Sequence, residues 1–420
     1  MEDLIYWIWL SLSCTPGSQT FARLLEKFND AREIYEADDN DILKSVTSQS
    51  KDYDSLTNKD LERARLIFDF CRSKNVGILT YNDERFPSSL KSIPTPPVML
   101  YFRGVLPNFN NLFSVSVVGT RRLSEYGRKN AFNISFDLAR SGALIVSGMA
   151  LGIDGVAHSG ALAAGRSTVA VIGSGIDVCY PKQHRRLARE IVKSGCVFTE
   201  YPPGARPDGY NFPVRNRIIS GLSSVTLVIE GRERSGALIT ARHAKEQGRA
   251  VYALPGNVGN SNSEVSNLLI KNGASLCTSA DDIVRDFEMQ ACGKLNPFEL
   301  AKKVQVDMNA VLSALQVSCV AQDDRIFRPS KSAKSEVVSP EAKNSDIVKS
   351  DIDQPEAPHE EGFDSDAIKI YKKIPSGAEC TIESLVDSEM NLRMVMKGLL
   401  KLEMGRFITM LPGEKVKRNF

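Results

Sequence analysis

Short apolar, β-branched runs alternate with helical stretches between residues 112 and 287. The runs are SVSVVG (114–119), ALIVSG (143–148), STVAVIG (167–173), CVFTE (196–200), VTLVIE (225–230) and RAVYALPG (249–256). Helices are expected between them near 125–141, 152–164, 182–193 and 236–247. The runs lack polar alternation, which is typical of strands buried on both faces. The pattern therefore predicts an α/β domain with a doubly wound, mostly parallel, Rossmann-like sheet.

The chain before this region reads as helical over residues 1–75. The string TFARLLEKF (20–28) places apolar residues at helical spacing, and Pro16-Gly17 before it predicts a turn. An apolar first helix is expected to bury Trp7 and Trp9. We interpret this part as a small helical domain of the SAM or helix-hairpin-helix kind.

Residues 76–112 form a proline-spaced connector that leads into the α/β domain, which we place at 76–290. Four prolines, Pro87, Pro94, Pro96 and Pro97, occur in this connector. Because proline removes a backbone donor and restricts the residue before it, we expect extended chain here and no helix.

The remainder of the chain changes character twice. Residues 291–362 begin as a helical extension and continue, from 322, as a stretch rich in Ser, Asp, Glu, Lys and Pro, which predicts a disordered linker. Residues 363–415 regain periodicity. The strings AIKIYKKI, TIESLVDSEM and NLRMVMKGLLKLEMGRF predict three helices and FITMLPGEKVKR a β-ribbon, which is the element order of a winged helix.

The amino-acid composition is that of an ordinary soluble globular protein and does not by itself indicate a partner. The 420 residues are 42% hydrophobic and carry a formal net charge of +2, so any attraction for nucleic acid has to be local. The cysteines are scattered with no CxxC pair, which argues against a zinc site and a disulfide framework. No apolar stretch reaches the roughly 20 residues of a spanning helix, and the acidic start does not suit a signal peptide. We expect a cytoplasmic protein.

Glycine and serine recur where the predicted strands end. Thr120 and Arg121 follow the first strand; Ser147, Gly148 and Met149 the second; Gly173, Ser174 and Gly175 the third; and Ser235, Gly236 and Thr240 open the helix after 225–230. The carboxyl ends of parallel strands share one edge of a sheet, where ligands bind. Free N–H groups of first helical turns attract anions, so these turns predict a phosphate-binding rim.

Basic side chains flank the same turns. Arg121, Lys182, Arg215 and Arg217 are the candidates, with Asn216 between the last two. One mononucleotide needs only one or two cations, whereas a row of them suits a nucleic-acid backbone. Arg217 could instead pair with Asp208 or Glu200 as an internal brace. Arg185, Arg186 and Arg189 fit a solvated face equally well.

Catalytic and cofactor motifs are weak. The sequence has no GxxxxGK[ST] loop, and Gly173-Ser174-Gly175 lacks the third glycine of a dinucleotide fingerprint. Asp154 and His158 are spaced as a helix-facing pair, which more often is structural. We therefore expect no enzyme, no cofactor and no metal.

Several strings together resemble the DNA-processing protein A (DprA/Smf) family. They are VVGTR (117–121), SGMALGID (147–154), VIGSGID (171–177), YPK (180–182), FPVRNRIISGLS (212–223), SGALITA (235–241), ALPG (253–256) and LIKNGA (269–274). The resemblance implies an extended Rossmann-like domain that binds single-stranded DNA as a homodimer. It also implies loading of the RecA recombinase onto DNA taken up in natural transformation.

The resemblance also implies roles for particular residues. Arg121 matches a pocket arginine of the family, and Lys182 matches a DNA-contacting lysine. The chain departs from the family pattern at Leu151, His184 and Val265. Val265 lies near the segment that resembles the dimer surface, which we expect near Leu269, Ile270 and Leu276.

Two other readings of the α/β domain stay open. Related folds cleave nucleoside monophosphates, although the comparable turn RSGALITARHA lacks their catalytic Glu. Alternatively, the domain senses a free nucleotide while the winged helix binds duplex DNA.

Overall fold

The computed structural model describes most of the chain in two compact units, Met1–Phe327 and Arg328–Phe420. The described residues are 2–48, 50–233, 235–291, 293–302, 304–317, 365–375, 379–387, 390, 392–404, 407–411 and 415–418. The linker predicted at 322–362 lies outside these ranges.

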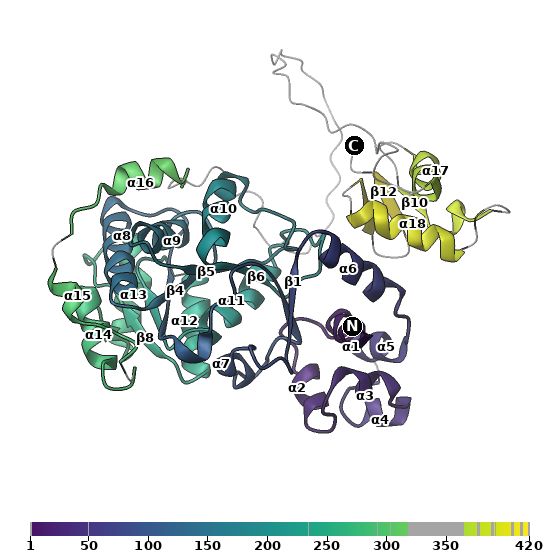
Figure 1. The fold of residues 1–420 in the computed structure, drawn as a ribbon, viewed down its shortest axis with the longest axis horizontal. Coiled ribbons are helices and arrows are strands. Elements are labelled where there is room, and N and C mark those ends of the chain that lie inside the picture. The colour runs from purple at the N-terminus through teal and green to yellow at the C-terminus, as the bar shows by residue number, and fades with distance from the viewer. Residues whose placement is uncertain are drawn as a thin grey trace, which may run out of the picture. The chain divides into compact units, whose positions relative to one another are not determined.

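The first unit is built on a nine-stranded sheet (Figure 1). Its strands are β1 (Gly77–Thr80), β2 (Met99–Gly104), β3 (Ser114–Val118), β4 (Leu144–Ser147), β5 (Thr168–Val171), β6 (Cys196–Thr199), β7 (Val225–Val228), β8 (Ala250–Ala253) and β9 (Ser275–Leu276). They lie in the order β1-β2-β6-β5-β4-β3-β7-β8-β9. Every pairing from β6 to β9 is parallel, which confirms the Rossmann-like α/β class.

Helices cover both faces of this sheet. They are α8 (Glu125–Arg140), α9 (Ile153–Ala163), α10 (Arg185–Ser194), α11 (Asn211–Gly221), α12 (Gly236–Glu246), α13 (Glu264–Lys271), α14 (Ala280–Phe287), α15 (Phe298–Ala301) and α16 (Met308–Ala314). One core joins the strands to α8, α9, α14 and α16, and the opposite core joins them to α11, α12 and α13. The central strands β3 to β7 are buried along their whole length, as apolar runs without alternation predict.

The predicted connector contributes to the sheet itself. Strands β1 and β2 pair antiparallel, and β2 extends the sheet by pairing antiparallel with β6. Between them lies a short helix, α7 (Ser88–Lys91), which corrects the expectation of no helix. Pro87 stands at the N-cap of α7, where a missing N–H costs nothing because that donor has no intrahelical partner.

Six helices precede the sheet. They are α1 (Glu2–Ser13), α2 (Thr20–Leu25), α3 (Ala31–Glu36), α4 (Asp39–Leu43), α5 (Lys51–Thr57) and α6 (Glu62–Ser73). Trp7 and Trp9 of α1 are buried in their common core, as predicted. The carboxylate of Asp52 on α5 accepts hydrogen bonds from Thr15, Ser18 and Thr20. These bonds fix the turn at Pro16-Gly17.

The second unit has its own core and a three-stranded sheet. Its elements are α17 (Ser365–Lys373), β10 (Glu379–Thr381), α18 (Leu392–Met404), β11 (Ile408–Leu411) and β12 (Lys415–Arg418). Helix, strand, helix and β-ribbon follow in the order of a winged helix. The segment TIESLVDSEM, predicted as a helix, instead supplies the end of β10 and one short 3-10 turn, Glu383–Leu385. The pairing of β10 with β12 overrides the local helical preference of the first residue of this segment, Thr381.

No helix among the described residues is long and apolar enough to cross a membrane.

Candidate functional site

A cavity of about 420 Å³ opens beyond the carboxyl ends of β3 and β7. The chain builds β3, β4, β5 and β6 outward in one direction and then returns to place β7 beside β3. This reversal of strand order is the topological switch point at which open α/β sheets bind ligands. The cavity is lined by Val118–Arg122, Ala150, Asp154, Gly209, Phe212, Pro213, Arg215, Asn216, Ile219, Arg232, Ser235–Ala237, Ile239 and Thr240.

The turn after β3 is held rigidly at one side of the cavity. The N–H of Thr120 donates to the carbonyl of Glu230, and the carbonyl of Thr120 accepts from the N–H of Ile153. Gly152 has a φ of 81°, and a Cβ at this position would lie 2.4 Å from the Thr120 carbonyl oxygen. Only glycine therefore lets the start of α9 approach the turn that carries Thr120 and Arg121.

The first turn of α12 forms the opposite side. Ser235 is the N-cap residue of this eleven-residue helix, with Gly236 directly after it. Among the residues that the structure describes, none forms a hydrogen bond with the buried hydroxyl of Ser235, and the N–H groups of a first helical turn have no partner within the helix. The helix dipole adds a partial positive charge at the same place. This arrangement suits an anion with several acceptor oxygens.

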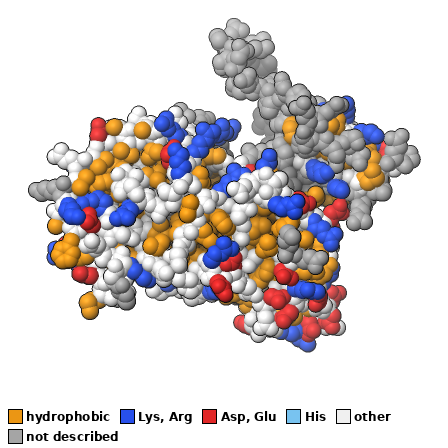
Figure 2. All heavy atoms as spheres, viewed as in Figure 1, with side chains coloured by type: hydrophobic (Ala, Val, Ile, Leu, Met, Phe, Trp, Pro, Cys, Tyr) orange, Lys and Arg blue, Asp and Glu red, His pale blue; other side chains and the backbone are white. Residues whose placement is uncertain are grey.

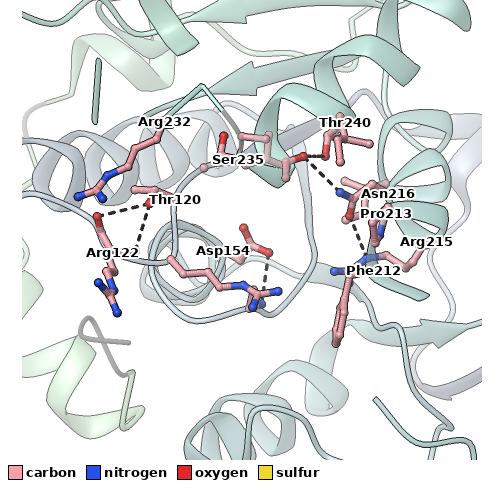
Figure 3. A pocket seen from close by; sticks show the side chains of 18 of the residues that line it. Thr120, Arg122, Asp154, Phe212, Pro213, Arg215, Asn216, Arg232, Ser235 and Thr240 are labelled. Atoms are coloured by element: carbon pink, nitrogen blue, oxygen red, sulfur yellow. Dashed lines mark hydrogen bonds between the residues drawn. The ribbon is translucent and has the colours of Figure 1, made fainter. Parts of the chain in front are cut away.

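A hydrogen-bonded network on α11 joins the two sides (Figure 3). Nη1 of Arg215 donates to the carbonyls of Gly148 and Val171, and its Nε donates to Oδ1 of Asn216 at 3.2 Å. Nδ2 of Asn216 in turn donates to the carbonyl of Gly236 at 3.4 Å. Burial lowers the pKa of Arg215 to about 10. The guanidinium therefore stays charged at neutral pH and adds a fixed positive charge behind the cavity.

Phe212 forms an aromatic wall beside these cations. The guanidinium carbon of Arg121 lies 5.5 Å from its ring centroid, and that of Arg215 lies 5.8 Å away. The ring of Tyr180 packs against the same phenyl at 5.6 Å between centroids. Such cation–π contacts hold the Arg121 guanidinium in place at the side of the cavity.

The one carboxylate that lines the cavity is committed to the backbone. Oδ2 of Asp154 accepts from the N–H of Ala150 at 3.2 Å. Burial raises the pKa of Asp154, and the neighbouring charge of Arg215 opposes that rise. Asp154 therefore shapes the turn after β4 and balances the Arg215 charge.

Seven of the residues proposed from the sequence line this cavity. They are Thr120, Arg121, Arg215, Asn216, Ser235, Gly236 and Thr240. Gly148 lies directly behind them, because its carbonyl accepts the hydrogen bond from Arg215. Sequence periodicity thus located the two turns nearest the switch point.

Other proposed residues lie outside the lining of this cavity. Ser147 is fully buried and its hydroxyl donates to the carbonyl of Val117. Ser174 is buried and its hydroxyl donates to the carbonyl of Val178, while the N–H of Gly175 donates to Ala205. Gly173 lies against the ring of Phe212. The turn after β5 is therefore covered by the segment leading into α11.

Three further proposed residues also differ from expectation. Met149 is 1% exposed, and its carbonyl accepts from Nδ1 of His184. Arg217 is paired with Glu200 in a buried ion pair, so the internal-brace alternative holds and this residue offers no charge to a ligand. Lys182 is exposed on the 3-10 turn Lys182–His184, outside the cavity lining and two residues after Tyr180 in the chain.

The structure adds lining residues that sequence reasoning missed. Arg122 and Arg232 also line the cavity, and Phe212 supplies its wall. Arg122 follows Arg121 directly, so its position after β3 was a usable signal. Phe212 opens the string FPVRNRIISGLS and lies in the first turn of α11, which was also a usable signal, whereas Arg232 neither ends a strand nor begins a helix.

The proposed dimer surface is only partly exposed. Leu269 is 5% exposed and belongs to the core of the first unit, whereas Leu276 is 50% exposed. Ile270 is half-buried. Leu269 is therefore corrected from a surface residue to a core residue.

Two buried histidines predict that stability falls on acidification. His158 and His184 have no exposed surface, and burial lowers the pKa of His158 to about 3 and also lowers that of His184. The unfolded chain takes up protons below about pH 6.5, which the folded chain does not. We expect the free energy of unfolding to fall by up to about 1.4 kcal/mol per pH unit for each histidine as the pH drops below about 6.5.

Urea denaturation between pH 7.5 and 5 measures this slope. His158→Gln should make it shallower, whereas His243→Gln, on the surface of α12, serves as the control. An unchanged slope in the His158 variant would show that this imidazole does not titrate on unfolding.

Comparisons with known proteins agree with this site. The family model of DNA recombination-mediator protein A matches residues 77–288. Protein Smf of Synechocystis is 41% identical over 216 residues, which cover 51% of this chain and 54% of that protein. DNA processing protein DprA of Bacillus subtilis is 36% identical over 227 residues, which cover 54% of this chain and 76% of that protein.

The X-ray structure of DprA from Streptococcus pneumoniae has the same fold. It superposes with a TM-score of 0.58 and 34% sequence identity, covering 66% of this chain and 95% of that one. The match thus spans about half the length of the Synechocystis relative and nearly all of the S. pneumoniae structure. Because the matched region contains every strand of the large sheet and the whole cavity lining, the chain belongs to the DNA recombination-mediator protein A family.

Proposed function

We propose that this protein binds single-stranded DNA and holds backbone phosphates in the cavity between β3 and β7. The observation that supports this most strongly is the first turn of α12, which lines the same cavity as Arg121, Arg122 and Arg232. The N–H groups of this turn have no partner within the helix, and the helix dipole adds a partial positive charge there. A phosphate oxygen would accept hydrogen bonds from these first-turn N–H groups.

A strand suits the site better than a free nucleotide. Besides Arg215, whose charge Asp154 balances, the cavity lining holds Arg121, Arg122 and Arg232, which are more cations than a single phosphate engages. Its only carboxylate, Asp154, is bonded to the backbone and so does not hold a ribose hydroxyl as dinucleotide sites do. Successive phosphates of a polymer match both features.

We further propose that the site acts by binding and does not catalyse a reaction. General acid–base cleavage needs a carboxylate or imidazole within reach of the reacting group. Among the lining residues, Asp154 is the only such group, and its oxygen accepts from a backbone N–H. His158 lies one helical turn further along α9, fully buried and bonded to Thr168.

The family supports a role in recombination. We propose that the bound strand is passed to a RecA recombinase, which fits the description of the matched family as DNA recombination-mediator protein A. The relatives named DNA processing protein fit DNA taken up in natural transformation. We propose that this chain acts as a homodimer in that step, with the exposed Leu276 in the contact.

Fluorescence anisotropy with the full chain tests the binding proposal. We expect a labelled oligo-dT to bind more tightly than a duplex of equal length, with affinity that falls steeply as salt rises. An excess of thymidine monophosphate should not displace it. Equal binding of duplex would favour the nucleotide-sensing alternative, and release of free base from a nucleotide would favour the hydrolase.

A further inference from the structure

A second cavity, of about 180 Å³, lies beside α10 and is separate from the crevice between β3 and β7. Its walls come from β2, β6, α10 and the segment that follows β5. Arg103, Arg185 and Arg189 line it together with Cys179. No residue of this cavity lines the first one.

The cations of this second cavity are available to a ligand. Arg185 and Arg189 are exposed on α10, and no ion pair within the described residues engages either of them. Nε of Arg103 is buried and has no hydrogen-bond partner in the described part of the chain. The one carboxylate of the lining, Asp177, already accepts from the N–H of Gly204 at 2.8 Å. The cavity therefore presents unmatched positive charge and a buried donor.

The floor of the cavity is apolar. Met149, Ile172 and Val197 are each less than a tenth exposed and belong to one hydrophobic core, and Val192 packs against it from α10. Val197 and Arg103 are partners in the register of β6 and β2, so an apolar and a cationic group lie side by side. A free phosphate would leave this apolar floor unused. A nucleotide uses both parts, since its base is apolar on its faces and its phosphate is anionic.

The two cavities are connected along the protein by one segment. Phe212 in the wall of the first cavity contacts Tyr180, and Tyr180 lies two residues before the exposed Lys182. Arg185 begins α10 directly after the 3-10 turn that carries Lys182. Figure 2 shows Lys and Arg side chains gathered at the place where Figure 1 labels α10. Two cations, Lys182 and Arg185, therefore follow Tyr180 along the segment that leads to the second cavity.

We propose that the second cavity takes a further nucleotide of the strand held in the first cavity, with its base on the apolar floor and its phosphate against Arg185 and Arg189. This inference rests on the proposed function. Lys182 then contacts the backbone between the two cavities. The unpartnered Nε of Arg103 donates to an acceptor on the edge of the base or to a phosphate oxygen.

A matched pair of variants tests the phosphate contacts. Arg185→Ala/Arg189→Ala removes both cations of the cavity, whereas Arg186→Ala/Lys193→Ala removes two exposed cations of the same helix that do not line it. Binding of oligo-dT from about 4 to about 20 nucleotides is measured against salt. For long oligonucleotides we expect the first double variant to lower the slope of log affinity against log salt by about 1.4, for two lost phosphate contacts. Oligonucleotides that are long enough to fill only the first cavity should bind the Arg185→Ala/Arg189→Ala variant as tightly as they bind the wild type.

Cys179 reports occupancy of the cavity without any substitution. It is half-buried and lines the cavity, and burial raises the pKa of its thiol. We expect a long oligo-dT to slow alkylation of Cys179, read from its peptide by mass spectrometry, while thymidine monophosphate leaves the rate unchanged. Protection by the mononucleotide at the same concentration would identify a free nucleotide as the ligand and overturn the strand path.

The outcomes separate this inference from the proposed function. If Arg121→Ala abolishes binding but the two double variants on α10 behave alike and Cys179 stays unprotected, the second subsite is refuted and the first stands. If Arg121→Ala binds as the wild type does, the proposed function fails irrespective of α10.

Val192→Phe fills the apolar floor without changing charge. We expect this variant to weaken the binding of long oligonucleotides only. Unchanged binding by this variant would show that no base enters.

Discussion

Arg121→Ala should weaken binding of single-stranded DNA roughly 10- to 100-fold, because a hydrogen bond to a charged group contributes about 1.5–3 kcal/mol. Arg121 lines the cavity at the turn after β3, and its guanidinium lies over the ring of Phe212. Removing one phosphate contact should also lower the salt dependence of binding by about 0.7 in the log–log slope. Fluorescence anisotropy at several salt concentrations measures both quantities.

Arg166→Ala is the matched control for this experiment. Arg166 is exposed just before β5 begins, at the end of the sheet opposite the cavity. Its loss changes the net charge by the same amount, so any general electrostatic effect appears in both variants. Equal losses of affinity in the two variants would show that Arg121 acts only through net charge.

Arg217→Met should destabilise the folded protein by about 3–5 kcal/mol, because it leaves a buried carboxylate without its partner. Nη1 and Nη2 of Arg217 donate to the two oxygens of Glu200 at 2.6 and 2.7 Å, and both side chains are at most 6% exposed. Nε of Arg217 also donates to the carbonyl of Thr95 at 2.9 Å. The pair thus ties α11 to the end of β6 and to the proline-rich segment before β2.

Urea denaturation of the first unit's transition measures this loss. The double variant Glu200→Leu/Arg217→Met should recover much of the stability, since apolar residues can replace a buried ion pair at little net cost. A loss below about 1 kcal/mol in the single variant would mean that water reaches Glu200 on relaxation. DNA binding normalised to folded protein should stay near the wild-type value, because Arg217 does not line the cavity.

Much of the fold could be predicted from hydrophobic periodicity. The buried strands β3 to β8 coincide with the apolar runs, because a strand covered on both faces tolerates few polar side chains. Strands β1 and β2 were missed because the prolines around them hid two short antiparallel segments at one side of the sheet. Proline spacing excludes long helices and central strands, but it does not exclude strands near an edge.

The site was predictable where the sheet topology alone determines position. Thr120 and Ser235 lie at the ends of neighbouring strands β3 and β7, so any doubly wound order that places these strands together also unites the two turns. Ser174 follows β5, and β4 lies between β5 and β3 in the sheet. Strand order beyond the switch point, and the covering of that turn by the segment before α11, depend on tertiary packing that local sequence does not encode.

Buried polar residues were the hardest to assign. Arg215 and Arg217 lie two residues apart in the same string, FPVRNRIISGLS. Arg215 lines the cavity, whereas Arg217 forms a buried ion pair with Glu200. Their side chains leave α11 in different directions, and only the position of Glu200 at the end of β6 decides which of them is neutralised. A charge count along the sequence treats both as equivalent.

If the cavity between β3 and β7 binds a backbone phosphate through Arg121, as we claim, a thermodynamic cycle will detect the coupling between that phosphate and the arginine. Wild type and Arg121→Ala are each titrated with a minimal oligo-dT in which one phosphate at a time is replaced by an uncharged methylphosphonate. At one linkage, the substitution should weaken the wild type but not the variant, with a coupling energy above about 1 kcal/mol. Additive losses at every linkage would contradict the claim.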